Sequence, residues 1–131
     1  MADWKQFPGP KAPAEEGFAR IAVTDGVDQA VAAYDAVKAR YPQEVVIREK
    51  VLNRIGSEGV YQGLPQNAVK ILQLNVHAWP DSSDAHENLA EAYEATGQKG
   101  LAIESYKKSL ALNPANADAI EGLKKLQPAR Q

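Results

Sequence analysis

The stretch from Ser83 to Asn116 constrains the fold more than any other, because it holds two apolar stripes at helical spacing. Spacings of three and four residues place each stripe on one face of a helix. Gly97 separates the stripes, where a helix end favours a residue that tolerates positive φ, and Pro114 cannot continue the second helix. The stretch therefore predicts an antiparallel helix pair. The stripes consist of Leu89, Ala90 and Tyr93, then Leu101, Ala102, Ile103, Tyr106, Leu110 and Leu112.

This stretch resembles the tetratricopeptide repeat, a helix–turn–helix unit of about 34 residues. The run 26–42 resembles the second helix of a more degenerate repeat, with Ala30, Tyr34 and Pro42 at corresponding positions. The resemblance implies a non-catalytic module for protein–protein interaction or scaffolding. The signature residues that carry it are Leu89, Ala90, Tyr93, Gly97, Ala102, Tyr106 and Pro114.

Helical periodicity and Pro or Gly breaks predict seven helices along the chain. We expect the third helix to fray or kink after Gly59, and Gly56 to be a position of close packing. The spacing of Pro42, Pro80 and Pro114 indicates that the middle repeat carries extra residues, which we place in the glycine-rich turn around residues 59–63. The helices are predicted at residues 14–24, 27–41, 44 to about 61, 65–78, two between 83 and 113, and 117–127.

These helices predict an all-α fold, a right-handed superhelical stack of about three antiparallel pairs with a capping helix. Residues 1–13 are rich in proline and read as an irregular leader, whereas 14–131 read as one helical domain. Trp4 and Phe7 in the leader are expected either to pack on the first helices or to contact another domain or a partner. The repeats are expected at about 14–44, 45–82 and 83–116, and the capping helix at 117–127.

Residues 14–127 also resemble the helical tail found behind serine hydrolases of the β-lactamase-like and esterase type. The runs LNRIG, NAVKILQLNVHAWPDSSDAHENLAEAY and AIESYKKSLALNPANADAIEGLKKL carry this resemblance. Such tails have a longer leucine-rich stretch where this chain has residues 57–63. The resemblance implies an alternative function, a structural or dimerisation accessory tail of a serine hydrolase, and does not imply the hydrolase activity.

Composition argues against several function classes. A net charge of −2 does not favour binding to nucleic acid or to an anionic membrane. The lack of cysteine excludes disulfides and thiolate metal sites. The spacing of His77, Asp81, Asp84 and His86 matches no metal-binding motif. We expect both histidines to be structural, and the chain to be neither an enzyme nor a cofactor-binding protein. Asn75, polar on an apolar helix, is expected to hydrogen-bond backbone in the following loop.

An acidic helix face is the most suggestive surface feature. Steps of three, four and three residues place Asp84, Glu87, Glu91 and Glu94 on one side of a helix, opposite the apolar stripe. Stacks of such repeats have a concave groove that binds partners, and we expect this face to line it and to bind a basic protein or peptide. The alternative is that the face is only solvated. The acids disfavour capture of a C-terminal carboxylate. The expected groove residues are Asn53, Arg54, Asp84, Glu87, Asn88, Glu91 and Glu94.

Self-association is a further alternative for the partner. The N-terminal sequence MADWKQFPGP lacks the apolar core of a signal peptide. We therefore expect a cytoplasmic protein by default, or a periplasmic one if the chain is cut from a secreted precursor.

Overall fold

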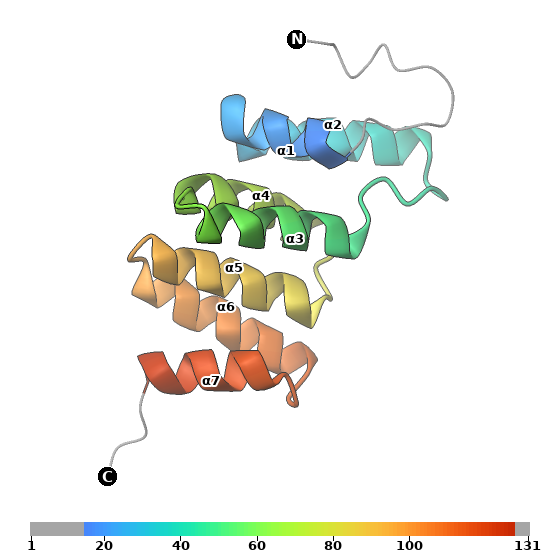
Figure 1. Cartoon of the computed structure of the whole chain (residues 1–131). Helices are drawn as coiled ribbons and strands as arrows, with labels where there is room; N and C mark the ends of the chain where they lie inside the picture. The colour runs from blue at the N-terminus through green and yellow to red at the C-terminus, as the bar shows by residue number, and fades with distance from the viewer. Residues whose placement is uncertain (1–14, 128–131) are drawn as a thin grey trace.

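Seven α-helices make up the described part of the computed structural model, residues 15–127, and they stack as successive pairs (Figure 1). The pairs α1–α2, α3–α4 and α5–α6 follow one another, and α7 lies beyond α6 at the end of the stack (Figure 1). The predicted all-α stack of helix pairs is confirmed. The helices are α1 Glu15–Thr24, α2 Val27–Arg40, α3 Glu49–Tyr61, α4 Pro65–Ala78, α5 Ser83–Ala95, α6 Lys99–Leu112 and α7 Ala117–Leu126.

Local capping signals set the ends of α4, α5 and α7. Pro65 is the first residue of α4, where its missing N–H costs no helical hydrogen bond. The Ser82 hydroxyl accepts a hydrogen bond from the Ala85 N–H (3.1 Å), and Asn116 Oδ1 accepts one from the Ala119 N–H (3.2 Å). Gly97 follows α5 with a φ of 76°, as its position between the stripes predicts.

Helix α4 joins the two hydrophobic clusters of the core. Ile71 and Leu74 pack into the first cluster, with side chains from α1, α2, α3 and the 41–48 connection. Leu72, one position further round the helix, packs into the second cluster with side chains from α5, α6 and α7. Helix α4 therefore packs into both halves of the stack, and α3 also contacts α5.

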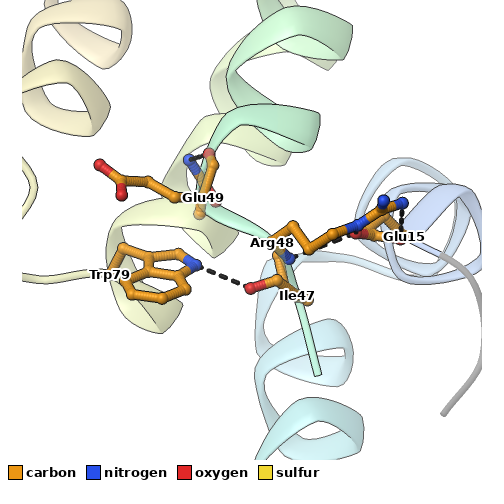
Figure 2. A network of polar contacts seen from close by, with 6 residues as sticks. Glu15, Ile47, Arg48, Glu49 and Trp79 are labelled. Atoms are coloured by element: carbon orange, nitrogen blue, oxygen red, sulfur yellow. Dashed lines mark hydrogen bonds and ion pairs between the residues drawn. The ribbon is translucent and has the colours of Figure 1, made fainter. Parts of the chain in front are cut away.

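The third helix begins at Glu49, so its predicted start at residue 44 is wrong. Val46 and Ile47 are buried, but they lie in an irregular connection, where the Trp79 indole N–H donates to the Ile47 carbonyl (2.8 Å, Figure 2). The Arg48 N–H donates to Glu15 Oε2 (3.2 Å), and the Arg48 Nε lies 2.7 Å from the same oxygen. These long-range contacts take the backbone groups that a helix would otherwise use.

The extra residues of the middle repeat lie in this connection and not in the glycine-rich turn. Residues 41–48 join α2 to α3, twice the length of the corresponding connections 79–82 and 113–116. The turn 62–64 between α3 and α4 is as long as the turn 96–98 between α5 and α6, so the glycine-rich turn carries no extra residues. With the longer connection, α2 packs against α4, and α1 contacts both α3 and α4.

The glycines of α3 lie at close helix contacts. A Cβ at Gly56 would lie 2.5 Å from Leu72 Cδ2, which confirms the expected close packing. A Cβ at Gly59 would lie 3.4 Å from the Ala68 Cβ. Helix α3 continues to Tyr61, so its predicted end is confirmed, and the predicted fraying directly after Gly59 is wrong.

None of the helices within residues 15–127 combines the length and the apolar character needed to span a bilayer. The leader, with Trp4 and Phe7, lies outside the described residues. The domain boundaries at 13 and 14 therefore stay predictions.

Candidate partner-binding groove

A groove of about 450 Å³ lies between α5 and α7, with further walls from α3 and α6. We call it the acidic groove, because four of its lining side chains are carboxylates and only one, Lys125, is a cation. The lining residues are Ser57, Val60, Glu91, Glu94, Ala95, Tyr106, Asp118, Glu121, Gly122 and Lys125.

Glu94 is held from two sides within this groove. The Tyr106 hydroxyl donates a hydrogen bond to Glu94 Oε1, and the Lys125 ammonium lies 3.1 Å from Glu94 Oε2. Burial, and then the hydrogen bond to Glu94, raise the pKa of Tyr106, so its hydroxyl stays a donor. Because Lys125 is engaged by Glu94, the groove keeps an excess of negative charge from Glu91, Asp118 and Glu121.

Glu87, one turn from Glu91 on α5, is not part of the groove lining, and only 6% of its surface is exposed. Burial, a hydrogen bond with Glu91 and the charges of Glu91, Asp118 and Asp84 raise the pKa of Glu87 to about 9. The raised pKa favours the protonated form of the Glu87 carboxyl in the folded chain. The expectation that its carboxylate lines an open face is wrong, because α7 covers part of α5.

Asn53 and Asn88 are also absent from the lining of the acidic groove. Asn53 is buried and its Oδ1 accepts a hydrogen bond from Asn75 Nδ2 (2.9 Å), so it does not line the groove as expected. Asn88 accepts from the Ser57 hydroxyl (2.7 Å) and donates to the Asp84 carbonyl (2.8 Å), which ties α5 to α3.

Two of the predicted residues are exposed but lie outside the lining of the acidic groove. Arg54 pairs with Glu58 one turn along α3 (3.3 Å) and lines a different hollow, towards α1. Asp84 is exposed near the start of α5. Of the predicted set, Glu91 and Glu94 are the residues that the structure places in the lining.

Asp118 and Glu121 are groove residues that the sequence analysis missed. Their signal lies in the repeat period, since Asp118 and Glu121 stand 34 residues after Asp84 and Glu87. Glu121 is exposed while Glu87 is buried, because α7 is the last helix of the described chain.

Gly122 lets α7 approach α6 closely enough to close the groove. A Cβ at this position would lie 2.3 Å from Cζ of Tyr106, which no real contact allows. The glycine therefore permits the observed position of α7, and with it the positions of Asp118 and Glu121.

Both histidines have structural partners away from the groove, as expected. His86 is buried and its Nε2 lies 2.8 Å from the Pro80 carbonyl, whereas His77 Nε2 lies 2.7 Å from Asp35 Oδ1. Asn75 donates to the Glu49 carbonyl (3.2 Å) in the preceding helix, so its predicted bond to the following loop is wrong. Within residues 15–127, no group of three or more His, Asp or Glu side chains could hold a metal ion.

Comparison with known proteins agrees with the helix-pair geometry. Residues 83–116 match the tetratricopeptide repeat family, over the pair α5–α6 and the following connection. Residues 83–116 are therefore similar to a tetratricopeptide repeat in both sequence and helix-pair structure. A crystal structure of MamA is 27% identical to this chain, with a TM-score of 0.56 over 82% of this chain and 60% of that one. A second crystal structure, described as MamA protein, is also 27% identical to this chain. Its TM-score is 0.55, and the match covers 86% of this chain and 60% of that one. No curated protein matches the sequence.

The tetratricopeptide-repeat match and the MamA-like structures support a protein-interaction scaffold, and the matching family is generally non-catalytic. The chain spans about three-fifths of the length of each MamA chain. Helix α7 begins 34 residues after α5, so it occupies the position of the first helix of a further tetratricopeptide repeat.

Proposed function

We propose that this chain binds a basic segment of a partner protein in the acidic groove between α5 and α7. The observation that carries the proposal is the convergence of Glu91, Glu94, Asp118 and Glu121 from two helices on one hollow. A cationic side chain entering this hollow would meet opposite charge from both walls.

The charge balance of the groove supports a ligand that brings its own cations. Lys125 offsets one carboxylate, Glu94. Among residues 15–127, Glu91, Asp118 and Glu121 form no ion pair with a Lys, Arg or His side chain. Lysine or arginine side chains of a partner would supply the missing charge.

We also propose that binding is not accompanied by catalysis. Neither His77 nor His86 lines the acidic groove, and Glu87 is buried outside its lining. A nucleophile with an adjacent base, the usual requirement for acyl or phosphoryl chemistry, is not assembled among the lining residues. The accessory tail of a serine hydrolase stays a prediction from the sequence.

Fluorescence anisotropy with a labelled oligolysine peptide tests the proposal, against an uncharged Gly/Ser peptide of equal length. We expect Glu91→Gln combined with Asp118→Asn to weaken oligolysine binding by about tenfold or more, which corresponds to about 1.4 kcal/mol. The matched control, Asp28→Asn with Glu104→Gln, removes two exposed acids from α2 and α6 and should bind as the parent does. Equal losses in both double variants would show only a response to net charge and would overturn the proposal.

A further inference from the structure

A second hollow, of about 460 Å³, lies between α1 and α3 with α4 as its floor. We call it the apolar groove, because Ala19, Val23, Ile55 and Ile71 provide apolar lining from all three helices. Its volume falls within the range of sites that accept a ligand side chain or a small molecule. The lining residues are Glu16, Ala19, Arg20, Val23, Thr24, Arg54, Ile55, Glu58 and Ile71.

The charged residues around the apolar groove cancel one another. Arg20 and Arg54 contribute two positive charges, and Glu16 and Glu58 contribute two negative charges. The apolar groove therefore selects neither sign of charge, unlike the acidic groove. Burial of an apolar side chain is the interaction that its lining favours.

Helix α3 connects the two grooves. Arg54, Ile55 and Glu58 line the apolar groove, while Ser57 and Val60 of the same helix line the acidic groove. The first helices of successive pairs, α1, α3, α5 and α7, contact one another in order. A segment that crosses these four helices would pass over both grooves.

The helix spacing fixes the separation of the two grooves. Packed helices lie about 8–10 Å apart, so the step from between α1 and α3 to between α5 and α7 is about 16–20 Å. An extended chain covers about 3.3–3.6 Å per residue, so about five or six residues span this distance.

We propose that one extended partner segment occupies both grooves, with an apolar side chain in the apolar groove and a lysine or arginine about five or six residues away in the acidic groove. The inference rests on the proposed function, because it requires a basic segment in the acidic groove. It adds the second subsite, the chemistry of its occupant and the spacing between the two anchors.

Labelled peptides with two lysines at one end and a single leucine at increasing distance from them test the proposal. The matched series carries alanine in place of leucine. We expect leucine to tighten binding by about tenfold or more when it stands about five or six residues away, and to have a smaller effect at shorter distances. Methyl NMR should show shifts at Ile55 and Val23 with the leucine peptide, while Ile103 on α6 serves as an unaffected reference.

The outcomes separate this inference from the proposed function. Lysine-dependent binding with no effect of leucine or its position would overturn the second subsite and leave the acidic groove as the binding site. Loss of lysine dependence would overturn both. Shifts of the Ile55 and Val23 methyls in the peptide-free full chain, on replacing Trp4 and Phe7 by alanine, would identify the chain's own leader as the occupant and overturn the proposal.

Discussion

Gly122 of α7 lies directly against the ring of Tyr106 of α6, with room for no Cβ between them. We expect Gly122→Ala to lower the free energy of unfolding by about 1–3 kcal/mol, because the added methyl forces the two helices apart. Gly100, in the first turn of α6, has open space around it, so Gly100→Ala should raise stability by about 0.4–1 kcal/mol through the entropy of the unfolded chain. Urea unfolding of both variants measures the difference, and equal effects of the two would contradict the packing account.

Glu87 makes stability depend on pH. Its pKa is raised to about 9 by burial, by Glu91 and by the charges of Asp118 and Asp84, against an ordinary value of 4.5. The folded chain therefore binds more protons than the unfolded chain between these values. The stability that Glu87 contributes is complete below about pH 4.5 and is lost as pH rises towards 9.

Removal of this carboxyl should flatten that dependence. We expect the free energy of unfolding of Glu87→Gln to fall less between pH 5 and 9 than that of the parent, because the glutamine amide cannot ionise. Urea unfolding at a series of pH values measures the slope. Glu104→Gln, at an exposed position of α6, should keep the parent's slope. A Glu87→Gln slope equal to the parent's would show that Glu87 ionises normally.

The contact between Glu15 and Arg48 acts at the acid end of the pH range. The hydrogen bond from Arg48 lowers the pKa of the Glu15 carboxyl, so its contribution is present above about pH 4.5 and is lost as pH falls through the lowered value. We expect Glu15→Gln to cost about 1 kcal/mol at pH 7, since Arg48 is largely exposed, and almost nothing at strongly acidic pH.

Thermal unfolding at the two pH values measures this loss. Glu44→Gln, an exposed position in the same connection between α2 and α3, should unfold as the parent does at both. A Glu15→Gln variant as stable as the parent at pH 7 would mean that the ion pair does not hold the connection.

The helices from α4 onward were predictable because their signals are local. Apolar spacing, Pro65, Gly97 and Asn116 each act within a few residues of the helix end that they define. The start of α3 was not predictable in this way. Val46 and Ile47 continue the apolar pattern of α3, and the contact that keeps Ile47 out of the helix comes from Trp79, 32 residues away.

The groove shows the same division between local and distant causes. The carboxylates of Glu91 and Glu94 follow from the face of one helix. The burial of Glu87 and Asn53 depends on neighbouring helices. The residue spacing within α5 or α3 alone therefore does not predict it. Asp118 could have been found by applying the 34-residue period to Asp84, but its place in the groove also depends on the close approach of α7.

The central claim, that a basic segment binds between α5 and α7, is tested most directly by NMR of the full chain titrated with oligolysine. Side-chain carboxyl signals report each acid separately. We predict shifts at Glu91, Asp118 and Glu121, and none at Asp28 or Glu104. Shifts of equal size at all five positions, or at none of the groove positions, would contradict the claim.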